Sequence, residues 1–166
     1  GTAATSIDLN GALYGIVQNI ACNTTSGSGG GNNAARMRGA STGSIFKNIK
    51  VIDSDNIGIV AEPSGGQGQV IGCTILGADG QGIQVNGPEC RIIDNYIVDA
   101  GDDGISFETS GDNSTCTGNI VKDHGANSIE ITTNAENCVV VGNRTDGAVS
   151  DGSGTSTVAS NDVTAF

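Results

Sequence analysis

Large aromatic side chains are almost missing from this sequence. There is no Trp, and aromatic residues make up only 3% of the 166 residues. Pro occurs twice, whereas Gly occurs 27 times, about twice its usual share. This composition excludes a globular core built around large side chains, but aliphatic residues are plentiful, so the chain is not expected to be disordered. Small apolar residues between many turns predict a long, thin core.

Basic residues and long apolar runs are scarce as well. Seven Lys and Arg stand against 18 Asp and Glu, for a formal net charge of −11. Such a surface repels phosphate backbones, which argues against nucleic-acid partners and favours neutral partners or divalent cations. No stretch approaches the ~18 apolar residues that span a membrane, and no signal peptide is visible. Because Gly1 is not a natural initiator, we expect a fragment or a processed product of a longer protein.

A repeat of about two dozen residues runs through most of the chain. One strand-like segment of each repeat alternates apolar and polar residues with a period of two. A second short apolar segment ends on an Asn, replaced once by Cys. This series is Asn23, Asn48, Cys73, Asn95, Asn119 and Asn143. No stretch keeps a period of 3.6 over the ~10 residues that a helix needs, so each repeat predicts two or three short strands separated by turns.

Repeats of this kind predict a solenoid. One repeat cannot bury its apolar residues alone, whereas stacked repeats pair each strand in parallel with its equivalents ~4.8 Å above and below. The sequence therefore predicts an all-β, single-stranded parallel β-helix of about six coils. We expect a single domain over residues 1–166, with coils at about 5–147 and an irregular C-terminal loop and cap at 148–166.

The recurring Asn has a physical role in such a coil. Its amide both donates and accepts, so equivalent Asn side chains can hydrogen-bond along the axis and satisfy backbone groups that a turn leaves unpaired. Gly72, Asp94, Gly118 and Gly142 precede the later members, where a tight turn needs left-handed backbone angles. With these features, about residues 5–147 resemble the right-handed parallel β-helix superfamily, which includes pectate lyases, polygalacturonases and phage tailspikes.

The five Cys residues form no CxxC motif, so a zinc site is not expected. Cys90 and Cys138 occupy equivalent positions two coils apart, beyond disulfide reach, and Cys73 and Cys116 belong to other inward rows. We expect these four to be small buried hydrophobes, in a protein made in a reducing cytoplasm. The role of Cys22 stays open.

Outward positions of the alternating strands are polar. They form either an ordinary solvated sheet face or a shallow groove along which a saccharide lies. In the second interpretation, carboxylates and amides bind sugar hydroxyls. The predicted substrate-binding residues are Gln84, Asn86, Glu108 and Glu130.

One local cluster points to catalysis. Asp102 and Asp103 precede one alternating strand, and His124 precedes the next. The cluster resembles the paired-aspartate and histidine segments of polygalacturonases, which hydrolyse glycosidic bonds with inversion. The resemblance implies that Asp102 and Asp103 act as acid and water-activating base and that His124 supports them. The alternative is a set of turn residues beside a lone surface His, because Asp and Gly favour turns.

A lyase of this fold would use acidic residues for calcium and a basic residue for proton abstraction. Asp99, Asp102 and Asp103 offer clustered oxygens for calcium, whereas basic residues are scarce. No other cofactor is expected.

Three functional hypotheses remain open. The first is a glycan-recognising module that resembles a phage tailspike or receptor-binding domain. It would be exposed on a virion or extracellular surface, bind a polysaccharide or cell-surface glycan, and form a homotrimer without membrane insertion. The second is a non-catalytic structural or decoration protein of a virion or cell surface. The third is a polysaccharide hydrolase or lyase.

Overall fold

The protein, seen here as a computed structural model, is described over residues 6–24 and 32–164. These residues form short β-strands and no helix. None of them builds a helix that is long and apolar enough to cross a membrane. Every third strand belongs to the same sheet, so three parallel sheets of seven strands each, here named A, B and C, run the length of the molecule.

The strands of each sheet follow one another along the solenoid axis. Sheet A contains β1 (Ile7–Asn10), β4 (Ala35–Gly39), β7 (Ile59–Pro63), β10 (Ile83–Val85), β13 (Ile105–Phe107), β16 (Ile129–Ile131) and β19 (Val149–Asp151). Sheet B contains β2 (Ile16–Gln18), β5 (Ile45–Lys47), β8 (Gln69–Ile71), β11 (Arg91–Ile93), β14 (Thr115–Thr117), β17 (Val139–Val141) and β20 (Thr157–Ala159). Sheet C contains β3 (Ala21–Thr24), β6 (Lys50–Ser54), β9 (Thr74–Ala78), β12 (Tyr96–Ala100), β15 (Ile120–His124), β18 (Arg144–Thr145) and β21 (Asp162–Val163).

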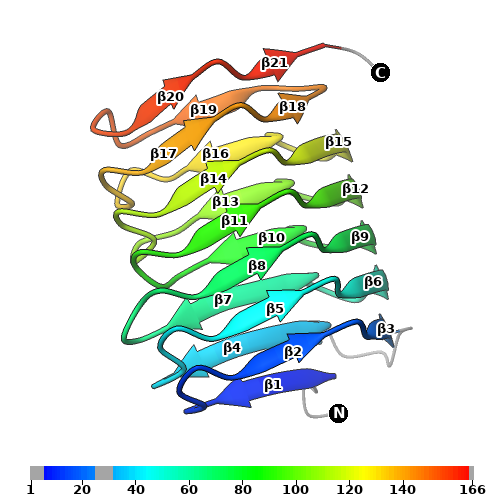
Figure 1. Cartoon of the computed structure of the whole chain (residues 1–166). Coiled ribbons are helices and arrows are strands. Elements are labelled where there is room, and N and C mark those ends of the chain that lie inside the picture. The colour runs from blue at the N-terminus through cyan, green and yellow to red at the C-terminus, as the bar shows by residue number, and fades with distance from the viewer. Residues whose placement is uncertain (1–5, 25–31, 165–166) are drawn as a thin grey trace.

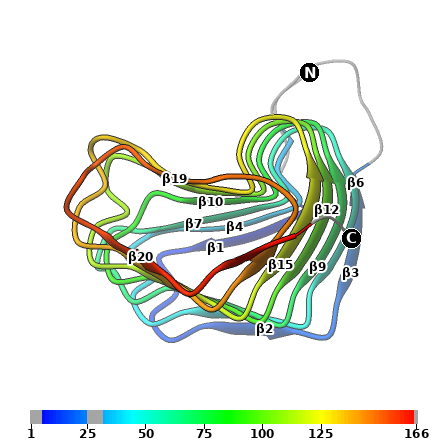
Figure 2. The same ribbon diagram turned by 90° about the horizontal axis from the view of Figure 1, so that it is seen from above.

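The predicted all-β parallel solenoid is confirmed. Figure 1 shows the coils stacked from β1–β3 at one end to β19–β21 at the other. Figure 2 looks along the axis and shows the three sheets as the sides of one thin coil. The last three strands pair with β16, β17 and β18, where the sequence predicted an irregular loop and cap. They escaped detection because the repeat shortens there to 18 residues, from Asn143 to Asn161.

Inward-facing side chains form rows along the axis. In sheet A, the inward row includes Ile59, Ile83, Ile105 and Ile129, paired in register and fully buried. Sheets B and C supply shorter aliphatic rows. Each buried aliphatic side chain stabilises the fold by about 1.5–3 kcal/mol relative to exposure, so the core is extended along the molecule rather than concentrated at one point.

All five Cys residues are buried in these rows and form no disulfide. The burial predicted for Cys73, Cys90, Cys116 and Cys138 is therefore confirmed, and Cys22 joins them in sheet C. Desolvation raises the pKa of the Cys73 thiol to about 11 and that of the Cys90 thiol to about 12. It also raises the pKa of Cys116. Thiols held in the neutral form are poor nucleophiles.

A buried asparagine ladder occupies the turn between sheets B and C. The Nδ2 of Asn95 donates to Oδ1 of Asn119, 2.9 Å away, and Asn119 donates likewise to Asn143. Each Oδ1 also accepts the backbone N–H of the preceding ladder residue, and Cys73 begins the series by donating its N–H to Asn95. Asn161 extends the ladder by one residue. The ladder satisfies backbone groups that this buried turn removes from water.

The first two predicted ladder positions are corrected. Asn48 lies one residue before the ladder position, which Ile49 occupies, and its exposed side chain bonds Asn19. It has a φ of 52°, so it belongs with Gly72, Asp94, Gly118 and Gly142 in the left-handed row of the turn. Asn23 lies in β3 opposite Ile52. The even spacing of the Asn residues in the sequence concealed these differences. Asn48 lies one residue before the ladder position, and Asn23 lies three residues after it.

Candidate functional site

The outer face of sheet A carries two rows that are polar except at the buried Val60. The first passes from Arg36 through Val60 and Gln84 to Ser106 and Glu130 in strand register. The second contains Asn10, Arg38, Glu62, Asn86 and Glu108. The two rows lie side by side because alternate residues of a strand point to the same side of the sheet. The sequence-predicted residues Gln84, Asn86, Glu108 and Glu130 therefore share one face.

The cations of this face are already paired. Arg36 donates to Glu62, and Arg38 donates to both carboxylate oxygens of Asp8, with Nη2 at 2.7 Å from Oδ2. Amide and hydroxyl groups dominate further along: Asn86 donates to Gln84 Oε1, and Ser106 Oγ donates to Glu108 Oε1. A ligand on this face meets carboxylate and amide oxygens rather than unpaired positive charge.

A carboxyl cluster, formed by Asp103 and Glu130, lies at one edge of the face. Asp103 is 4% exposed in the turn that enters β13, and its Oδ1 accepts the backbone N–H of Asn127 at 2.8 Å. The hydrogen bond to Asp103 raises the pKa of Glu130 to about 7, with burial and the negative charges of Asp103, Glu108 and Asp102 adding to the effect. Because Asp103 accepts a backbone N–H, we infer that Glu130 holds the shared proton.

The structure separates the three residues predicted to be catalytic. Asp102 bonds Gln81 at the surface, whereas the neighbouring Asp103 bonds inward and toward Glu130. His124 pairs in register with the buried Ala100, and its Nε2 lies 2.7 Å from Ser128 Oγ and 3.1 Å from Asp146 Oδ1. His124 is therefore not a lone surface residue, and its side-chain contacts are with Ser128 and Asp146 rather than with Asp102 or Asp103. It ends β15 with its side chain 9% exposed, because the left-handed residue Asp123, with a φ of 52°, interrupts the alternation of the strand just before it.

A polar hollow of about 550 Å³ opens where sheet A runs into its turns toward sheet B. We call it the proline hollow, since both Pro residues of the chain line it. Its lining residues are Glu62, Pro63, Ser64, Asn86, Pro88, Ser110 and Asp112. Sequence reasoning found only Asn86 here. The two Pro residues, 25 positions apart and thus one repeat apart, were the signal that could have revealed the rest.

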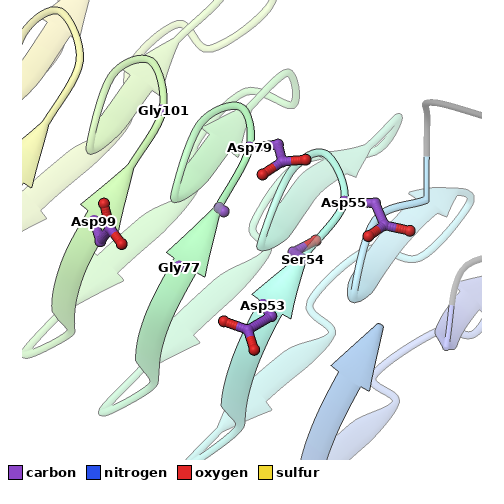
Figure 3. Close-up of a pocket in the computed structure, with 8 residues that line it drawn as sticks. Asp53, Ser54, Asp55, Gly77, Asp79, Asp99 and Gly101 are labelled. Carbon is purple, nitrogen blue, oxygen red and sulfur yellow. The ribbon is translucent and has the colours of Figure 1, made fainter. Parts of the chain in front are cut away.

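A second, acidic hollow of about 440 Å³ lies at the turn between sheets C and A. Figure 3 shows Asp53 and Asp99 at the ends of β6 and β12, and Asp55 and Asp79 on the turns that follow their strands. Asp99 thus lies in this hollow, whereas Asp103 belongs to the carboxyl cluster. Within residues 6–24 and 32–164, no three His, Cys, Asp or Glu side chains are grouped as metal ligands.

The comparisons with known proteins agree with this architecture. A family model described as "Right handed beta helix region" matches residues 3–145, which is most of the chain. The chain belongs to the right-handed β-helix family. No curated protein and no solved structure gives a significant match to this β-helix protein. The family match covers both polar rows of sheet A and the carboxyl cluster, but it extends only to the fold.

Proposed function

We propose that this β-helix protein binds a neutral glycan along the outer face of sheet A, with one sugar ring in the proline hollow. The observation that carries the proposal is the lining of that hollow. Glu62, Asn86 and Asp112 offer acceptors and donors for hydroxyl groups, and the rings of Pro63 and Pro88 offer apolar surface for sugar C–H groups. Such a module acts at a virion or cell surface.

Charge selects the class of glycan. The two Arg residues of the face are neutralised by Glu62 and Asp8, and further along lie Glu108 and Glu130. A uronic-acid polymer would bring its carboxylates against these carboxylates without an unpaired cation to receive them. Neutral hexose or N-acetylhexosamine polymers meet no such repulsion.

Binding can be tested on an array of neutral and acidic glycans, followed by calorimetric titration of each hit. We expect neutral glycans to bind. Asn86→Ala should weaken binding by at least about tenfold, which is the loss of affinity expected when one or two hydrogen bonds are removed. Thr117→Ala, a matched polar truncation on the outer face of sheet B, should leave the affinity unchanged. No binding to any neutral glycan, or equal losses in both variants, would disprove the proposal.

Glycoside hydrolysis is a second candidate, favoured by the pKa of Glu130, which suits a general acid. The close approach of the two carboxyl groups weighs against it. Hydrolases place their two carboxyl groups about 5–5.5 Å or about 6.5–9.5 Å apart, whereas Asp103 and Glu130 are close enough for hydrogen bonding to raise the pKa of Glu130. Release of reducing ends from bound glycans, lost in Glu130→Gln while binding persists, would establish hydrolysis. Absence of both binding and turnover would favour the structural, non-catalytic alternative.

A further inference from the structure

The outer face of sheet B differs in charge from the rest of the molecule. Its seven strands contain no Asp or Glu, in a chain that has 18. Their charged residues are Lys47 and Arg91, both exposed. Lys50 and Arg144 lie on neighbouring strands of sheet C, where Arg144 also approaches Asp162 at 4.0 Å. An acidic protein thus gathers most of its few cations around one face.

The same face is unusually apolar. One outward row runs from Lys47 through Ile71 and Ile93 to Thr117 and Val141, and every member after Lys47 is only partly buried. Sheet B faces the viewer in Figure 1, and no other described strand covers it. Apolar outward rows on a solvated sheet indicate a surface that meets another molecule.

Exposed large side chains adjoin this face at its N-terminal end. Leu13, Tyr14 and Ile16 are 62%, 72% and 61% exposed. Ile16 lies on β2 and continues the outward row of Ile45. Tyr14 lies against Gly43 of the next coil, so the ring covers a turn rather than entering the core. Together these residues widen the apolar part of the face.

We propose that the outer face of sheet B binds the acidic surface of a second copy of this chain, with the two solenoid axes parallel. Charge complementarity supports this occupant: a copy of the same chain offers Asp53 and Asp99 along the turn between sheets C and A. Lys47 and Asp53 belong to one coil, and Arg91 and Asp99 belong to another. The cations and the carboxylates are therefore spaced by the same two coils.

Symmetry then brings the matching charges to the same height. In a ring whose symmetry axis is parallel to the solenoid axis, each coil of one copy meets the same coil of its neighbour. Contacts between two different faces close into a ring when the rotation from one copy to the next divides the full circle evenly, and the trimer is the smallest such ring. Such an assembly leaves the outer face of sheet A open, so it does not depend on the proposed glycan binding.

The test is sedimentation of the full chain at about 50 mM and 500 mM NaCl. We expect a concentration-dependent oligomer that weakens at high salt. Lys47→Glu combined with Arg91→Glu should lower the association constant at least about tenfold, and so should Asp53→Asn combined with Asp99→Asn, in which Asn tolerates the left-handed backbone. Lys47→Arg with Arg91→Lys, which keeps the charges, should associate as the natural chain does. Circular dichroism checks that each variant is folded.

A monomer at all concentrations, or an oligomer that neither charge change weakens, overturns the proposal. So does binding of the monomeric chain to anionic phosphatidylserine vesicles with loss in the Lys47→Glu, Arg91→Glu variant, because the occupant would then be a lipid surface. Glycan titration of the same variants separates the two proposals, since the sheet A site is intact in all of them.

Discussion

The side-chain amide of Asn119 donates a 2.9 Å hydrogen bond to Oδ1 of Asn143, a residue 24 positions further along the chain. The same amide donates to the carbonyl of Ile92 in the preceding coil, and the Oδ1 of Asn119 accepts the backbone N–H of Asn95. One fully buried side chain therefore satisfies polar groups of three successive coils.

Asn119→Ala should destabilise the protein strongly. The substitution leaves the N–H of Asn95 and the carbonyl of Ile92 buried without partners, at about 1–3 kcal/mol each. We expect a loss of about 3 kcal/mol in denaturant titration. Asn48→Gly is the matched control: Asn48 is exposed and off the ladder, and Gly accepts its left-handed backbone, so the loss should stay below about 1 kcal/mol. Equal losses would contradict a structural role for the ladder.

Glu130→Gln should change how stability depends on pH. The pKa of Glu130 is raised to about 7 in the folded state, above its usual value near 4.3 in an unfolded chain. The folded state therefore binds the extra proton, and the stabilisation is complete below about pH 4.3 and is lost as the pH rises through 7.

Gln stays neutral and can still donate to Asp103. Thermal and urea unfolding should thus show similar stabilities at pH 4.5, with the variant about 1 kcal/mol more stable at pH 8, a value reduced for the partial exposure of Glu130. The exposed Glu136→Gln is the control, because Glu136 lies outside the carboxyl pair of Asp103 and Glu130. A variant that is less stable at pH 8 would refute proton sharing with Asp103.

Gly104→Ala should disturb the entry into sheet A. A Cβ at this position would lie 2.1 Å from Cγ1 of Val121 and 2.6 Å from the carbonyl oxygen of Ser128. Overpacking of this kind costs about 1–3 kcal/mol, which lowers Tm by roughly 5 °C in a chain of this size. Gly142→Asn meets no atom within 4 Å and keeps a residue that tolerates φ > 0, so its Tm should change little. A reversed order of the two melting points would be evidence against this packing.

The five thiols should be unreactive in the native protein. All are buried, and desolvation raises the pKa of each one. Mass spectrometry after iodoacetamide treatment at pH 8 should find no alkylated Cys in the folded chain and five in guanidinium chloride. Native-state labelling of Cys138 alone would indicate local opening near the C-terminal coils.

The sequence predicts the fold well because a repeat multiplies a weak signal. Each short strand is ambiguous alone, but the recurrence of apolar alternation and of Asn95, Asn119 and Asn143 identifies the coil. The errors arise where the repeat changes length. A one-residue shift assigned Asn48 to the ladder in place of Ile49, and the shortened last repeat concealed β19–β21.

The candidate site is less predictable because it depends on which way turn residues point. Alternation along the strands correctly grouped Gln84 and Glu130 on one face. It could not show that Asp103 turns toward Glu130, or that His124 turns inward after the left-handed residue Asp123. Left-handed residues and turns break the period of two, so the alternation of the strand does not predict the orientation of the side chain that follows them.

The asparagine ladder also gives the solenoid a mechanical polarity. Every Oδ1 in the ladder accepts a backbone N–H from the preceding coil, and the first donor of the series is the N–H of Cys73. From there to Asn161 the coils are tied by buried polar bonds, whereas the same column holds Ile20 and Ile49 in the first two. Those two coils depend on apolar contacts and strand pairing, so fraying under heat or force should begin at β1–β3 and progress toward the stiffer C-terminal half.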